Sequence, residues 1–308
     1  MRASMIPRAE VVALARDVLG DAVVRIERVP VGFGSENWRV VTKGGVFVLK
    51  VGPPESAAKW NSTRRAHEIA SDVGLPIHRL VHFSASDVTV VRVFEWVDGL
   101  HPTSLSGQPE KLERFAVDLA TSLARLHTVE MSGFTSRLDG SAPLFGRWRD
   151  YVAYRLGQIR VRSMARNALD PSTLDRACEV ISGLAAEVDH VVQPSLCHRD
   201  LHPDNLLVNA EGRLVAVLDW DMAEAWDAAG EWFKLELHLF PSVPGVEAPF
   251  TRAYRAAIEE DLPLWDRRTR LVSLMESMNT VANVAHVPGQ AEYAAQARTK
   301  LHALLNAG

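Results

Sequence analysis

The chain has 308 residues, of which 47% are hydrophobic and 23% are charged, a composition typical of a folded globular protein and not of a disordered one. No apolar run reaches about 18 residues, so we expect no membrane-spanning helix, and a net charge of −4 disfavours nucleic acid as a partner. The cysteines Cys178 and Cys197 are too few for a disulfide framework. Pro7 and Arg8 interrupt the start of the chain, which argues against a secretion signal. We therefore expect a cytoplasmic protein of about two domains.

The first hundred residues alternate β-rich runs with one helical segment. Strands are expected at Ala22–Val29, Trp38–Val41, Val46–Val51, Leu80–Phe83 and Val88–Phe94, and a helix at Glu55–Asp72. Gly32 and Gly34 mark a tight turn between the first two strands. A small, mostly antiparallel sheet with one helix packed on it is the natural result.

From Pro109 onward the apolar residues follow a helical period. Helices are expected at 109–126, Trp148–Met164, Pro171–Asp189 and around Leu271–Val281, with two short strands at Leu206–Val208 and Leu214–Leu218. The sequence thus predicts an α+β fold with two lobes. Residues 1–98 form a β-rich N-terminal lobe, and residues 99–308 form a larger, mostly helical C-terminal lobe.

The charge is divided unevenly between these lobes. Residues 1–100 carry a net charge of +2 and residues 101–308 a net charge of −6. Scattered, solvated acids explain this difference in the simplest way. The functional alternative is a C-terminal lobe that attracts a cationic small molecule.

The densest polar run lies before the strand Leu206–Val208, in the segment His198-Arg199-Asp200-Leu201-His202-Pro203-Asp204-Asn205. The next strand then ends in Asp219-Trp220-Asp221, which places a carboxylate at the end of the hairpin. Carboxylate and amide oxygens suit a hard cation such as Mg²⁺. A carboxylate left free of metal could accept the proton of a hydroxyl nucleophile.

The spacing His198-x-Asp200-x-x-x-x-Asn205, followed by Asp219, resembles the catalytic loop and metal-binding aspartate of the protein-kinase-like superfamily. Within it, the run from His198 to Val208 is similar to the aminoglycoside phosphotransferase-like family of small-molecule kinases. The resemblance implies a two-lobed protein-kinase-like fold. It also implies that Asp200 takes the proton of the acceptor hydroxyl and that Asn205 and Asp219 hold Mg²⁺.

Three further residues near this loop are candidates for supporting roles. His198 is expected to stabilise the loop through hydrogen bonds, while His202 and Asp221 are candidate supporting or substrate-contacting residues. Zinc is a weak alternative for His198 and His202, because Pro203 breaks the helix that such a pair would need.

The resemblance places the nucleotide site in the N-terminal lobe. Lys50 ends an apolar strand, as does the phosphate-pairing lysine of kinases, and Glu68 on the following helix is its expected partner. Glu95 and Val97 lie where the resemblance puts the hinge, whose backbone would bind the base of ATP or GTP.

The turn at Gly34 and Ser35 is a second candidate for nucleotide contact. A glycine backbone can approach phosphates without a Cβ in the way. Asn37 stands where protein kinases have a third glycine, so this turn departs from their pattern.

The resemblance implies a Mg²⁺-dependent enzyme that moves the γ-phosphate of ATP or GTP to a hydroxyl of a small molecule, and it also supplies the candidate acceptors. An antibiotic of the aminoglycoside, macrolide or nucleoside type is the first expected acceptor. A metabolite of the choline, homoserine, methylthioribose or sugar type is the alternative. A non-catalytic pseudokinase is the rival from another class, and the intact set of catalytic residues argues against it. The acceptor pocket is expected within Ala142–Arg166 and Phe233–Asp266, and the oligomeric state is left open.

Overall fold

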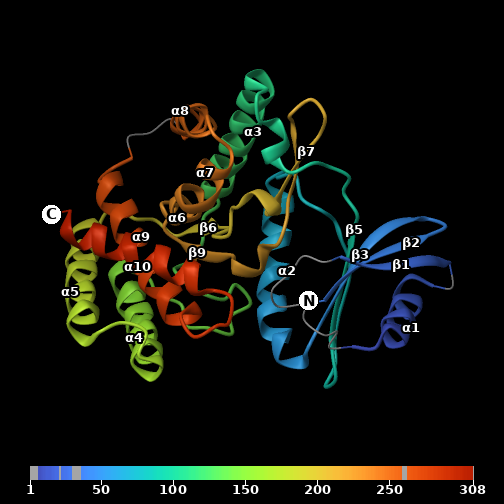
Figure 1. Cartoon of the computed structure of the whole chain (residues 1–308), viewed down its shortest axis with the longest axis horizontal. Helices are drawn as coiled ribbons and strands as arrows, with labels where there is room; N and C mark the ends of the chain where they lie inside the picture. The colour runs from blue at the N-terminus through green and yellow to red at the C-terminus, as the bar shows by residue number, and fades with distance from the viewer. Residues whose placement is uncertain (1–5, 21, 30–35, 259–261, 308) are drawn as a thin grey trace.

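The computed structural model describes residues 6–20, 22–29, 36–258 and 262–307. Figure 1 shows a β-rich N-terminal lobe beside a larger helical C-terminal lobe, with helix α2 (Ala57–Asp72) between them. This is the two-lobed α+β architecture that the sequence predicts. No helix in the described ranges is long and apolar enough to span a membrane.

A five-stranded antiparallel sheet in the order β1-β2-β3-β5-β4 forms the N-terminal lobe. Its strands are β1 (Val23–Val29), β2 (Glu36–Thr42), β3 (Gly45–Gly52), β4 (Leu80–Ala85) and β5 (Val90–Glu95). All five lie where β-rich runs were expected. Because side chains alternate across a sheet, each strand sends every second residue to the same face.

Helix α1 (Arg8–Leu19), which the sequence analysis missed, covers one face of this sheet. Its Val11 and Ala15 pack in one apolar cluster with Leu49 and Val93. Lys50 of β3 and its register partner on β5, Arg92, therefore point to the opposite face, toward α2.

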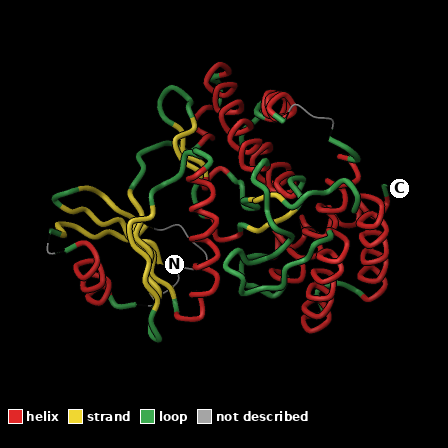
Figure 2. Tube along the Cα trace, turned by 180° about the vertical axis from the view of Figure 1, so that it is seen from behind, coloured by secondary structure: helices red, strands yellow, loops and turns green. Residues whose placement is uncertain are grey.

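Helix α2 lies against that opposite face and separates the sheet from the helical lobe in both views of the chain trace (Figure 2). Ala66 and Ala70 on its inner side belong to the large core of the C-terminal lobe. Although α2 follows β3 in the sequence, its packing ties the two lobes together.

The C-terminal lobe is built mainly of helices that share one core. They are α3 (Pro109–His127), α4 (Trp148–Arg166), α5 (Pro171–Val188), α6 (Gly230–Lys234), α7 (Phe240–Ser242), α8 (Glu247–Ala257), α9 (Trp265–Val284) and α10 (Ala291–Asn306). Helix α9 carries the Leu and Met stripe noted in the sequence, and Leu271, Met275 and Met278 are fully buried. That stripe is core.

Two pairs of very short strands position the polar loops. β7 (Leu206–Val208) pairs with β8 (Leu214–Val217), as expected, and β6 (Ser195–Cys197) pairs with β9 (Glu224–Trp226). Residues 198–205 connect β6 to β7, and residues 218–223 connect β8 to β9. These two pairings bring both connections side by side.

The linker between the lobes is itself hydrogen-bonded to the C-terminal lobe. Leu100 and Val208 exchange two backbone hydrogen bonds of 2.8 Å each. A Cβ on the preceding Gly99 would lie 2.9 Å from the Cβ of Leu207. This close approach requires a glycine at that position.

Candidate active site

His198 joins the two polar connections. Its Nε2 donates to the carbonyl of Leu218 at 2.9 Å, and its Nδ1 accepts the backbone N–H of Asp200 at 3.2 Å. This pattern places the ring proton on Nε2. The buried ring also packs edge-on against Trp220, with centroids 4.7 Å apart. His198 thus braces the loop and does not face the cleft.

Glu231 of α6 holds the same loop from behind. Its two carboxylate oxygens accept the backbone N–H groups of His198 and Arg199. Burial raises the pKa of Glu231, but His127 and the other partners outweigh it and leave the pKa below its ordinary value. His127, Cys197 and Glu231 lie within 4.8 Å of one another, yet the amides of the loop occupy both Glu231 oxygens. We interpret this cluster as structural.

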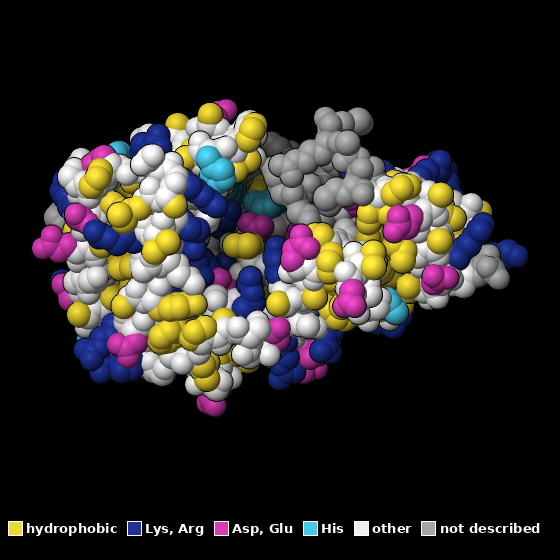
Figure 3. Space-filling view, turned by 90° about the horizontal axis from the view of Figure 1, so that it is seen from below, with side chains coloured by type: hydrophobic (Ala, Val, Ile, Leu, Met, Phe, Trp, Pro, Cys, Tyr) yellow, Lys and Arg dark blue, Asp and Glu magenta, His cyan; other side chains and the backbone are white. Residues whose placement is uncertain are grey.

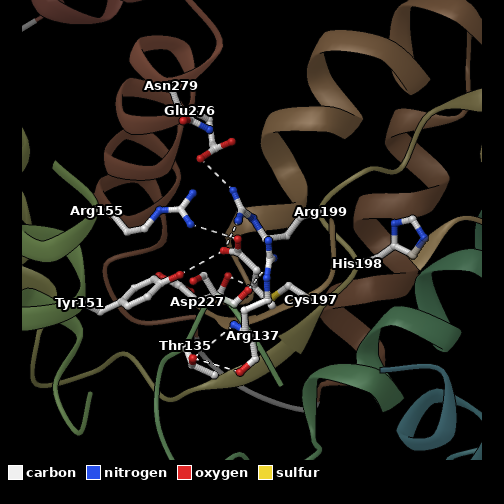
Figure 4. Close-up of polar contacts among 12 residues, drawn as sticks. Thr135, Arg137, Tyr151, Arg155, Cys197, His198, Arg199, Asp227, Glu276 and Asn279 are labelled. Carbon is white, nitrogen blue, oxygen red and sulfur yellow. Dashed lines mark hydrogen bonds and ion pairs between the residues drawn. The ribbon is translucent and has the colours of Figure 1, made fainter. Parts of the chain in front are cut away.

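Two residues beside the cleft adopt left-handed backbone conformations, Arg199 with φ +63° and Asp219 with φ +57°. Each costs about 1–2 kcal/mol for a residue with a Cβ. Arg199 is held by an ion pair with Glu224 and another with Glu276 at 2.8 Å, and it stacks on Trp226 at 3.6 Å. These contacts, drawn in part in Figure 4, offset the strain.

Asp200 and Asn205 lie together at the front of the loop. The Asn205 side-chain nitrogen donates to the backbone carbonyl of Asp200 at 2.9 Å. That orientation leaves the Asn205 side-chain oxygen available as a ligand.

Lys234 of α6 contacts Asp200 directly, with Nζ 3.1 Å from Oδ1, and the sequence analysis did not assign it a role. The Tyr293 hydroxyl lies 3.2 Å from the same nitrogen. Burial alone would raise the pKa of Asp200, but Lys234, then His202 and His198, leave it below its ordinary value. Burial lowers the pKa of Lys234, and Asp200 and Tyr293 overcome this effect to raise it. Both groups are therefore ionised at neutral pH.

His202 lies on the same side of the loop. Its Nε2 is 3.8 Å from Asp200, and its ring centroid is 6.3 Å from that of His238. Burial, followed by the charge of Lys234, lowers the pKa of His238 to about 4. Asp200 thus lies among basic side chains, of which Lys234 is the nearest.

Asp219 and Asn205 form the candidate metal site. The backbone N–H of Leu218 donates to the carbonyl of Asn205 at 2.8 Å, which brings Asp219 beside Asn205. Asp219 Oδ1 is buried and accepts no hydrogen bond from the residues that the structure describes, and it lies 3.5 Å from Lys50 Nζ. An under-paired carboxylate oxygen next to an amide oxygen fits a hard divalent cation such as Mg²⁺.

The expected ion pair between Lys50 and Glu68 is not formed. The Glu68 side chain is 41% exposed and contacts Arg64 and Arg65 at 2.9 and 3.2 Å. The buried side of α2 is set by residues at helical spacing, including Thr63, Ala66, His67 and Ala70. Glu68 follows His67 and is rotated off that side by about 100°.

Asp221 is bound between α2 and the sheet, where the charge of Lys50 acts on it. Arg92 binds it through two hydrogen bonds of 2.6 and 3.1 Å, the Thr63 hydroxyl donates to it at 3.1 Å, and Lys59 lies 3.5 Å away. Arg92 also stacks on Trp60 at 3.7 Å. Burial opposes ionisation, but Arg92 lowers the pKa of Asp221 well below its ordinary value. The sequence offered one signal for Arg92, a charge inside an apolar strand, which has to be paired when buried.

The remaining predicted nucleotide contacts are the linker residues Glu95 and Val97 and the turn residues Gly34 and Ser35. The N–H groups of Glu95 and Trp96 bind the carbonyls of Arg79 and Val46, whereas Val97 makes no backbone hydrogen bond to the described residues. That leaves the Val97 backbone free at the linker. Gly34 and Ser35 lie outside the described residues.

Comparison with known proteins gives a consistent result. The model of the phosphotransferase enzyme family matches residues 25–268. The crystal structure of aminoglycoside phosphotransferase APH(4)-Ia is 19% identical with a TM-score of 0.76, covering 97% of this chain and 99% of that one. A thermostable mutant of the same enzyme, in a ternary complex with AMP-PNP and hygromycin B, is 18% identical with a TM-score of 0.75, again covering 97% and 99%.

A third similar structure carries the name of a different kinase. A candidate fructosamine-3-kinase from Thermobifida fusca is 18% identical with a TM-score of 0.70, covering 97% of this chain and 98% of that one. No curated protein matches the sequence. At these identities the structural matches establish the fold.

Proposed function

Since the chain belongs to the phosphotransferase enzyme family, we propose that it transfers the γ-phosphate of ATP or GTP to a hydroxyl of a small molecule with the help of Mg²⁺. The observation that carries this proposal is the convergence of four polar side chains. Asp200 and Asn205 lie on one connection, Asp219 on the adjacent one, and Lys50 reaches Asp219 from the sheet.

Each of these residues has a chemical task in the proposed reaction. Asp200 is ionised and accepts the proton of the acceptor hydroxyl as the oxygen attacks phosphorus. Asn205 and Asp219 would hold Mg²⁺, which neutralises charge on the phosphate oxygens when it is bound. Lys50 pairs with the α- and β-phosphates.

Lys234 adds a second cation beside Asp200. Its ammonium keeps Asp200 deprotonated and can stabilise negative charge that develops on the transferred phosphoryl group. We assign Lys234 to this position because its nitrogen lies 3.1 Å from the proposed base.

For the acceptor, an antibiotic hydroxyl is the first candidate. It is supported by the likeness to a phosphotransferase whose structure contains hygromycin B together with a nucleotide analogue. A sugar-type metabolite is the second candidate, supported by the likeness to a candidate fructosamine-3-kinase.

The test is nucleotide-diphosphate release with Mg²⁺ and either ATP or GTP, across a panel of antibiotics and metabolic alcohols. The Asp200→Asn variant keeps the shape of the side chain and removes its basicity, so it serves as the matched control. We expect acceptor-dependent release that falls by about 10²–10⁴-fold in the variant. Equal release by both proteins would contradict the assignment of Asp200.

A further inference from the structure

A cavity of about 570 Å³ lies beside the Asp219-Trp220-Asp221 turn, between the start of α2 and helices α4 and α9. Its ionisable lining residues are Lys59, Arg137, Arg155, Arg162, Asp221 and Glu224. Ala142 and the α4 residues belong to the segment in which the sequence predicts the acceptor pocket. Figure 3 shows a hollow between the two lobes with Lys and Arg side chains around it.

Both carboxylates of this cavity are already neutralised by arginines. Asp221 is bound by Arg92 at 2.6 Å. Glu224 is bound by Arg155 at 3.0 Å, by Arg199 and by the Tyr151 hydroxyl (Figure 4). The lining therefore carries an excess of positive charge, although residues 101–308 as a whole carry a net charge of −6.

Arg162 carries this excess into the cavity. Arg162 donates to the amide oxygen of Asn279 at 3.0 Å. In the part of the chain that the structure describes, no carboxylate lies within ion-pair distance of it, and its Nε has no hydrogen-bond partner. The Nε of Arg155, a residue only 8% exposed, is also without a partner. Burial and the nearby charges of Arg155 and Arg166 lower the pKa of Arg162.

We propose that this cavity binds an anionic group, a carboxylate or a phosphate, and that the acceptor alcohol carries it. The second half of this inference rests on the proposed function. The guanidinium of Arg162, which has no carboxylate partner among the described residues, favours an anion at this partly buried cavity wall, because hydrogen bonds to a charged group are strongest there. A polycationic aminoglycoside would instead meet the like charge of Arg162.

The anion site is tested by calorimetric titration with inorganic phosphate and with malonate at constant ionic strength. The variants are Arg162→Gln and Lys59→Gln, neither of which lies in the apolar core. The control is Arg160→Gln on the same helix, since Arg160 binds Asp175 and does not line the cavity. We expect Arg162→Gln to weaken binding of at least one probe by about tenfold, and Arg160→Gln to leave it unchanged. Equal binding by wild type and Arg162→Gln, or no binding by wild type, would overturn the site.

Turnover measurements test whether the acceptor alcohol carries the anionic group. Acids and phosphate esters are compared with their own amides and alcohols in the panel, using wild type and Arg162→Gln. A preference for the anionic member that Arg162→Gln abolishes supports the inference. Turnover restricted to neutral or cationic acceptors would overturn it. Anion binding that depends on Arg162, without any Asp200-dependent turnover, would reject the proposed function and leave the anion site standing.

Discussion

The two carboxylates of the Asp219-Trp220-Asp221 turn have opposite surroundings. Asp219 is 39% exposed, and Lys50 at 3.5 Å is its one cationic partner among the described residues. Asp221 is 16% exposed and is bound by Arg92, Lys59 and Thr63. A carboxylate with few partners is available for a cation from solution, whereas a fully paired one holds structure. Two residues apart, the same chemical group is thus open to a ligand at one end of the turn and tethered by ion pairs at the other.

The largest effect that this comparison predicts is on turnover in Asp219→Ala. Loss of a metal ligand should reduce Mg²⁺-dependent nucleotide turnover by about a thousandfold or more. The thermal unfolding midpoint should fall less than in Asp221→Ala, because Asp219 Oδ1 makes only the 3.5 Å contact with Lys50 among the described residues. Steady-state kinetics and a thermal melt measure the two quantities, and full activity would remove Asp219 from the metal site.

Asp221→Ala should show the reverse pattern, a loss of stability. It leaves Arg92, which is 2% exposed, buried without a carboxylate, at a cost of about 3–5 kcal/mol in the free energy of unfolding. Urea denaturation measures this change. Replacing both partners, in Arg92→Met with Asp221→Leu, should recover much of it, since the cost lies in the unpaired charge. An unchanged free energy of unfolding in Asp221→Ala would contradict the structural role of Asp221.

Lys234→Met extends the comparison to Asp200, a third carboxylate paired with one cation. Without Lys234, burial would raise the pKa of Asp200, so the acid limb of the kcat/KM profile should move to higher pH. At neutral pH we expect a loss of about 10–100-fold. The stability that ionised Asp200 contributes is present above its unfolded pKa and is lost as pH falls through its lowered folded pKa, so it should also shrink in this variant.

The control for that profile is Lys300→Met. Lys300 binds Glu236 at 3.0 Å rather than Asp200. Its profile should therefore match that of the wild type. An identical shift in both variants would mean that general charge, and not the contact with Asp200, sets the pKa.

The smallest effect is expected for Glu68→Gln. Glu68 contacts the exposed residues Arg64 and Arg65, and such pairs contribute less than about 1 kcal/mol. Turnover and KM for the nucleotide should stay within about twofold of wild type. A loss as large as that of Lys50→Met would restore Glu68 as the partner of Lys50 and would leave Asp221 as an additional contact.

Whether a contact could be predicted from the sequence depends on how far apart its two residues lie in the chain. Asp200, Asn205 and Asp219 could be singled out because the motif that resembles the family spans only about twenty residues, and the structure brings the three together. Lys234 and Arg92 were missed because their partners are distant in the chain and are set by packing. Local patterns carry no information about such pairs.

Two local features were missed for different reasons. Helix α1 has only Val11 and Ala15 buried, so its apolar pattern is weak. By contrast, the small apolar residues Ala66 and Ala70 indicate which face of α2 is buried, and this face leaves Glu68 exposed. The prediction of Glu68 relied on its distance from Lys50 along the chain and ignored which face is buried.

Helix α2 has a consequence for any attempt to divide the molecule. The expected boundary near Asp98 assigns α2 to the first piece, yet Ala66, Ala70 and Leu75 are buried in the core of the second. The bonds between Leu100 and Val208 close the junction from the other side. A chain severed there would yield fragments that each expose half of a shared interior. Neither fragment should therefore fold stably without the other, and the two lobes are not independent domains that could be exchanged separately.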